Sequence, residues 1–138
     1  MAVETRMTAA ALAVAALMVA TGQAAAADDK GEASLAKILD GRVAGEPVTC
    51  LETGRAFGAE IVDRTAIVYR MPDGALYVNR PQAGAASLDR QAVLQSRPLI
   101  NSTCRGDRVD VIESGGKGGL ARGSVLLGVF TPYAKIKR

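Results

Sequence analysis

Two cysteines, Cys50 and Cys104, place the strongest constraint on what this chain can fold into. Two cysteines allow a single intramolecular pairing, and here that pairing would join segments that lie far apart in sequence. Redox-active pairs favour the close C-x-x-C spacing, so the separation favours a structural disulfide over a reactive thiol pair. On the chain-entropy model, closing a loop of this length stabilises a fold by about 4 kcal/mol. For a small domain, that is a large fraction of the total stability.

The first 27 residues have the pattern of a secretory signal peptide. Arg6 precedes an apolar run over residues 9–20, and the alanines at 24–27 end directly before Asp28. A basic start, an apolar stretch and a small-residue cleavage site are the parts of such a signal. The stretch is shorter than the roughly 20 residues of a transmembrane helix. We therefore predict cleavage of residues 1–27, a periplasmic or secreted bacterial protein, and no transmembrane segment after signal removal. The alternative is an N-terminal core or membrane-anchoring helix.

The rest of the chain has a length that suits one domain. We expect a flexible leader at residues 28–34, a single β-rich domain at 35–134 and a basic tail at 135–138. Basic residues are otherwise scattered, whereas nucleic-acid binders gather them in a stripe or cluster. No nucleic-acid partner is therefore expected. The tail suggests weak contact with an anionic lipid or polymer surface, which added salt would weaken; the alternative is a solvated chain end.

The clearest local signal is a β-hairpin that joins residues 65–70 to residues 75–80. Both segments are rich in β-branched and aromatic side chains, and the Met71-Pro72-Asp73-Gly74 sequence between them suits a type I turn closed by a glycine. The predicted register pairs Tyr69 with Tyr77, Val68 with Val78, and Ile67 with Asn79. Both faces are largely apolar, as expected for strands inside a sandwich or barrel.

The remaining segments predict a mainly β fold with few helices. We expect short helices at 33–40 and 87–95, an extended segment at 48–51, and strands at 99–103, 108–113 and 124–130. The predicted fold class is a small β-sandwich or barrel-like domain with one or two short helices and a single disulfide.

The chemistry is narrowed by the complete lack of histidine. Without histidine there is no Ser-His-Asp or Cys-His nucleophile, and the usual catalytic zinc ligands are missing. We assign no catalytic residue, no metal and no cofactor. The one enzymatic alternative is a small secreted hydrolase that uses a carboxylate pair, Glu60 with Asp63, in the manner of a glycosidase.

Four short runs stand out along the domain: Gly41-Arg42-x-Ala44-Gly45-x-Pro47-Val48-x-Cys50-Leu51, Ile61-Val62-Asp63, Tyr77-Val78-Asn79-Arg80-Pro81 and Leu127-Gly128-x-Phe130-x-Pro132-Tyr133. In combination they resemble a family of small exported (periplasmic) bacterial proteins of unknown function. The resemblance covers roughly residues 35–135 and implies export and a compact domain with paired cysteines. The family has no assigned catalytic residues, so no residue role follows from it.

Export, the lack of histidine and the apolar hairpin favour a non-enzymatic binding or interaction module of the bacterial periplasm. Its envelope partner or ligand is not identified by the sequence. Tyr69, Tyr77 and Asn79 would form a recognition surface if their face of the hairpin is exposed. The alternative is that both tyrosines lie in the core with satisfied hydroxyls.

Overall fold

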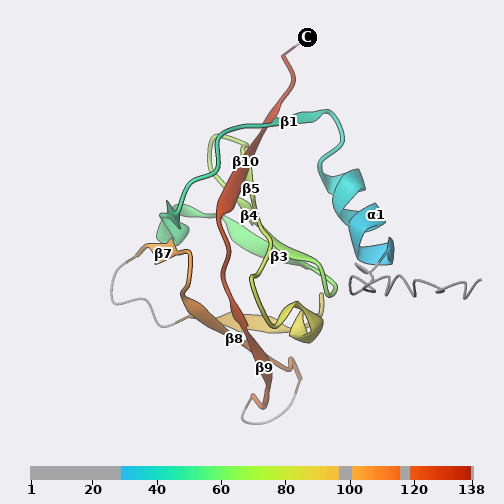
Figure 1. Cartoon of the computed structure of the whole chain (residues 1–138), viewed down its shortest axis with the longest axis vertical. Coiled ribbons are helices and arrows are strands. Elements are labelled where there is room, and N and C mark those ends of the chain that lie inside the picture. The colour runs from blue at the N-terminus through green and yellow to red at the C-terminus, as the bar shows by residue number, and fades with distance from the viewer. Residues whose placement is uncertain (1–28, 97–100, 116–118, 138) are drawn as a thin grey trace, which may run out of the picture.

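The computed structural model describes residues 29–96, 101–115 and 119–137 (Figure 1). The predicted signal peptide lies outside these ranges, as do residues 97–100, which include the first two residues of the strand predicted at 99–103. Within the described ranges the chain forms one α-helix, two 3-10 turns and ten β-strands. The mainly β prediction is therefore confirmed, with more strands than the sequence indicates.

The elements run in the order α1 (Asp29–Ile38), β1 (Arg42–Ala44), β2 (Cys50–Leu51), η1 (Thr53–Arg55), β3 (Gly58–Val62), β4 (Ala66–Arg70), β5 (Leu76–Asn79), η2 (Ala85–Ser87), β6 (Val93–Gln95), β7 (Thr103–Cys104), β8 (Arg108–Ile112), β9 (Ala121–Leu126) and β10 (Phe130–Lys135). A five-stranded antiparallel sheet has the order β1-β10-β5-β4-β3. A three-stranded sheet has the order β6-β8-β9, and β2 pairs with β7.

The predicted hairpin is strands β4 and β5, with the predicted register. The Met71 backbone N–H donates to Ala75 O at 3.0 Å and thereby closes the turn. Gly74 has a φ of +84°, a conformation that glycine adopts without steric cost. Local turn chemistry and alternating apolar residues therefore determine this part of the fold.

The five-stranded sheet is covered on both faces, which gives the domain three layers. On one face, Leu35 of α1 packs with Val68 and Val78 of the central strands. On the other face, Ile67 packs with residues of the three-stranded sheet such as Val111. Figure 1 shows α1 to one side of the larger sheet, and β8 and β9 at the end of the molecule opposite β1.

Helix α1 begins at Asp29, so residues 29–34 are helical where the sequence suggested a flexible leader. Its first turns lie against the β3–β4 turn. A Cβ atom added to Gly31 would lie 1.8 Å from Thr65 Oγ1, so this close approach requires glycine. The Glu32 carboxylate also accepts two hydrogen bonds from Arg80, at 2.5 and 3.0 Å. This ion pair lowers the pKa of Glu32.

The predicted helix at 87–95 is wrong. Asp89 accepts hydrogen bonds at its side chain from Gln91 N and at its main chain from Ala92 N, which forms a turn in place of a helix start. Asp side chains compete with helical hydrogen bonds in this way. The following residues pair with β8 as strand β6, and Leu94 packs on the core.

The apolar segment 124–130, predicted as one strand, is divided between two sheets. Strand β9 ends at Leu126, and β10 begins at Phe130 in the other sheet. The buried Asn79 amide binds the connecting segment, since it donates to Gly128 O at 2.8 Å and accepts from Gly128 N at 3.0 Å. A side chain distant in sequence thus determines where the chain changes sheet.

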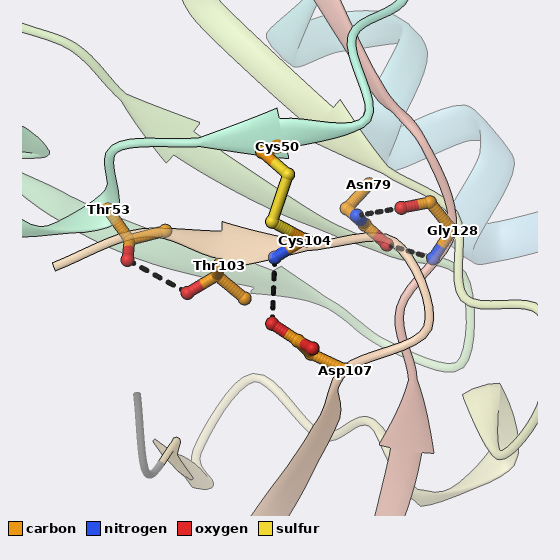
Figure 2. Close-up of a disulfide and its surroundings, with 7 residues drawn as sticks. All are labelled: Cys50, Thr53, Asn79, Thr103, Cys104, Asp107 and Gly128. Atoms are coloured by element: carbon orange, nitrogen blue, oxygen red, sulfur yellow. Dashed lines mark hydrogen bonds between the residues drawn. A yellow bond between two sulfur atoms is a disulfide. The ribbon is translucent and has the colours of Figure 1, made fainter. Parts of the chain in front are cut away.

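Cys50 and Cys104 face each other in the β2–β7 pair and form a disulfide with an S–S length of 2.04 Å (Figure 2). The hydroxyls of Thr53 and Thr103 share a hydrogen bond of 2.9 Å beside it. Cys104 N donates to Asp107 Oδ2 at 2.8 Å. The disulfide therefore joins the chain before β3 to the chain that enters the three-stranded sheet, which confirms the predicted pairing.

Replacing both cysteines by serine should lower the free energy of unfolding by about 4 kcal/mol, because the unfolded chain regains the freedom that the cross-link removes. Urea unfolding of the double variant and of the oxidised wild type measures the difference. Any loss of function in the variant should be proportional to the loss of folded protein. A variant that keeps wild-type stability, or one that stays folded but is inactive, would contradict a structural role for the disulfide.

Candidate functional site

The face of the hairpin that carries Tyr69, Tyr77 and Asn79 lies against the core. Tyr69 is 7% exposed and Asn79 is fully buried, while Tyr77 is partly buried against the same cluster. The Tyr69 ring lies 5.8 Å from the ring of Phe130, centroid to centroid. These three residues therefore form no open recognition surface: Tyr69 and Asn79 lie in the core, and Tyr77 lies at its margin.

The two carboxylates of the predicted acid/base pair do line one groove, and each is bound to an arginine. Arg70 donates to Glu60 Oε2 at 2.5 Å. The Arg90 backbone N–H donates to Asp63 Oδ1 at 2.6 Å, and its Nε lies 3.9 Å from Asp63 Oδ2. Both ion pairs are substantially exposed.

This open groove has a volume of about 640 Å³. It is lined by residues 59–63 of β3 and its end, by Ser34, Lys37 and Ile38 of α1, and by residues 90–92. Successive residues of a strand point to opposite faces of the sheet. A groove in contact with five consecutive residues must therefore run along the edge of the strand. Strand β3 is the outermost strand of its sheet, so no strand among the described residues pairs with this edge.

The hydrogen bond at the β4–β5 turn shows which residues of β4 direct their backbone N–H and C=O groups toward β5 and which direct them toward β3. Residues of an antiparallel pair alternately direct their N–H and C=O groups toward the partner strand and away from it. Because Met71 N donates to Ala75 O at the turn, Tyr69 directs its main-chain groups toward β5. Val68 then directs its groups the opposite way, toward β3.

The free edge of β3 follows from the same alternation. Glu60 lies opposite Val68, so its main-chain groups are directed toward β4. Ala59 and Ile61 alternate with Glu60 and therefore direct their N–H and C=O groups away from β4, into the groove. Among the described residues, no backbone hydrogen bond joins them to another segment.

The two walls of the groove are held by contacts from opposite faces of the sheet. Leu35, 1% exposed, fixes α1 on one face. On the other face, Arg64 N donates to Leu88 O at 3.0 Å, and Ala92 packs against the core. The β3 edge therefore lies at the floor, between a helical wall and the segment 90–92.

The carboxylates of this groove can be predicted from the sequence, whereas the strand edge at its floor was not expected. Ala59 and Ile61 carry no polar signal, and residues 58–62 were not predicted as a strand. The wall at 90–92 fell within the wrongly predicted helix. Alternation of apolar residues in Ala59-Glu60-Ile61 is the signal that could have found the strand.

Comparison with models of protein families, with curated proteins and with solved structures finds no match. The resemblance to small exported bacterial proteins therefore stays a prediction. No helix in the described ranges is long and apolar enough to cross a membrane. Nor do the described residues bring together three or more histidine, cysteine or carboxylate side chains that could hold a metal ion.

Burial of Tyr69 predicts a stability change at high pH. Burial raises the pKa of Tyr69 from 10.0 to about 12, because the folded protein disfavours the charged phenolate. The unfolded chain thus loses this proton first as the pH rises. The free energy of unfolding should be unaffected by this group below pH 10 and fall by roughly 3 kcal/mol on approaching pH 12.

Urea unfolding between pH 8 and pH 12 measures this contribution as the difference between wild type and Tyr69→Phe. The phenylalanine variant should lack that part of the decrease, whereas every contribution that does not depend on the Tyr69 hydroxyl remains in both proteins. If the free energy of unfolding falls by the same amount in both proteins above pH 10, the raised pKa of Tyr69 is contradicted.

Proposed function

We propose that this protein is an exported, non-enzymatic binding module of the bacterial periplasm that takes up an extended polypeptide along the free edge of β3. The observation that carries the proposal is the groove whose floor is the unpaired edge of β3 at Ala59 and Ile61. The disulfide between Cys50 and Cys104 supports an oxidising compartment.

The chemistry of the floor favours an extended chain over a compact ligand. Unpaired strand edges present a row of N–H and C=O groups at the spacing that another strand satisfies. Main-chain hydrogen bonds then provide affinity, and side-chain pockets on either side provide specificity. The groove follows residues 59–63, a length of strand that pairs with about five ligand residues.

The walls define which side chains such a polypeptide would carry. Alternate ligand side chains would face α1 and the segment 90–92, because a strand directs its side chains to both faces. Ile38 and Ala92 offer apolar contact on the two sides, and Lys37 adds a cation on the helical wall. We therefore expect ligands with apolar side chains and an acidic residue near Lys37.

Selection of displayed random peptides on protein purified from the periplasm of an expressing cell tests this proposal. A synthetic copy of a selected peptide should protect the Ala59 and Ile61 amides from hydrogen exchange, as followed by NMR. Ala59→Pro removes one edge N–H without removing a bond to β4, so it should weaken binding at least tenfold. Ala59→Val keeps the N–H and is the matched control, with nearly unchanged affinity.

Two results would overturn this proposal. One is a selected peptide that leaves the exchange of the Ala59 and Ile61 amides unaltered. The other is equal affinity of the proline and valine variants, provided that both show wild-type unfolding curves.

A small hydrolase remains the alternative function because the groove contains both Glu60 and Asp63. Screening of glycosides and other hydrolysable substrates would first have to show turnover. Glu60→Gln should then lower kcat at least 100-fold if Glu60 transfers a proton. The substitution removes one exposed ion pair, worth less than about 1 kcal/mol, so the fold should persist. Turnover that survives Glu60→Gln would remove the hydrolase.

A further inference from the structure

A second, smaller pocket lies at the end of the five-stranded sheet away from the groove walls at 90–92. It has a volume of about 250 Å³ and is lined by three cationic residues, Arg42, Arg70 and Lys135. None of its lining residues is acidic. Arg42 and Lys135 lie directly opposite each other in the β1–β10 pair. Like charges at such positions destabilise a sheet, so another requirement must favour them.

The partners of these cations leave positive charge at the surface. Arg42 donates to the carbonyl oxygens of Gly74 at 2.8 Å and Tyr133 at 3.2 Å, which are uncharged acceptors. Arg70 is paired with Glu60, which offsets its charge, so Arg42 and Lys135 carry the unbalanced positive charge of the pocket. Lys135 is exposed at the end of β10.

Two further carboxylates belong to this region, and both lie outside the pocket lining. Asp73 lies in the β4–β5 turn, where its Oδ1 accepts from Ala75 N at 2.9 Å. Asp40 precedes β1. Lys137, which follows β10 and is exposed, adds a fourth cation at this end.

Exposed apolar side chains accompany these cations. Phe57 lines the same pocket and is 79% exposed. Val43, the middle residue of β1, and Ile136, which directly follows β10, are each 58% exposed. Val43 pairs with Ala134, two residues before Ile136, so both lie on the face opposite Arg42 and Lys135. Apolar side chains therefore flank the cations on both faces of the sheet end.

We propose that this end of the sheet binds the surface of an anionic phospholipid bilayer. Phe57 enters the interface between headgroups and acyl chains, while Arg42 and Lys135 contact lipid phosphates. Exposed apolar side chains beside cations are the signature of such interfacial binding. A soluble polyanion would satisfy the cations but would leave Phe57, Val43 and Ile136 in water, which favours a membrane over a polymer. These residues lie outside the lining of the peptide groove.

Co-sedimentation with lipid vesicles tests the proposal, with protein purified from the periplasm as before. Vesicles of equal parts phosphatidylglycerol and phosphatidylcholine should bind the protein, and phosphatidylcholine alone should bind at least tenfold less. Lys135→Ala should weaken binding to the anionic vesicles about fivefold. Phe57→Ser should weaken it about tenfold. Binding should fall as salt rises.

The far end of the molecule supplies matched controls. Arg108→Ala removes an exposed cation from β8, and Leu120→Ser removes a side chain that is 76% exposed beside β9. Both controls should retain wild-type vesicle binding, and thermal unfolding establishes that all four variants are folded. Residues 1–28 are identical in all variants, so they cannot cause a difference in vesicle binding between one variant and another.

Two outcomes would overturn membrane binding: equal binding to anionic and neutral vesicles, or a wild-type affinity for Phe57→Ser. In the second case, loss of vesicle binding in the presence of heparin would identify a polyanion site instead. Peptide binding at the β3 edge is measured without lipid, so either proposal can fail while the other stands.

Discussion

Exclusion of strand β4 from water on both faces is the constraint around which the molecule is arranged. Ala66, Ile67 and Val68 have no exposed surface, so each face of the strand needs a covering layer. Helix α1 covers one face, and the three-stranded sheet covers the other. Strand β4 lies one strand from the edge, and α1 and residues 90–92 both line the groove beside the outermost strand, β3. The groove thus accompanies the burial of β4, because the helix and the segment that lie on its two faces also form the two walls beside β3.

A recessed edge also explains how the protein can keep an unpaired strand without adhering to its neighbours. Exposed flat edges promote association between copies, and natural sheets protect them with charges or with covering segments. Here the edge lies below α1 and residues 90–92, with Glu60 and Asp63 in ion pairs along it. A long exposed strand from another folded copy would meet these walls, whereas a flexible extended chain can enter between them.

The parts of the fold that could be predicted are those coded locally. The β4–β5 hairpin was predicted with its register because Pro72, Asp73 and Gly74 define its turn. The helix at 87–95 was predicted wrongly because Asp89, which resembles a residue of the first helical turn, forms a turn of its own. The break within 124–130 depends on Asn79, and the free edge depends on the order of strands in the sheet. The break and the free edge both depend on residues distant in sequence, so neither can be predicted from neighbouring residues. The carboxylates Glu60 and Asp63 could therefore be identified as a pair, whereas the strand edge beside them could not.

The position of β10 has a consequence for the order in which the protein can be made. This strand lies between β1 and β5, although the ribosome produces it after both. During synthesis the larger sheet is therefore divided in two, with β1 separated from β5 by an empty position until residues 130–135 emerge. Contacts of such wide sequence separation form slowly, because a long segment of chain must first be closed into a loop. A nascent chain that stays unfolded until late is one that a translocation channel can still thread, which agrees with the export proposed above.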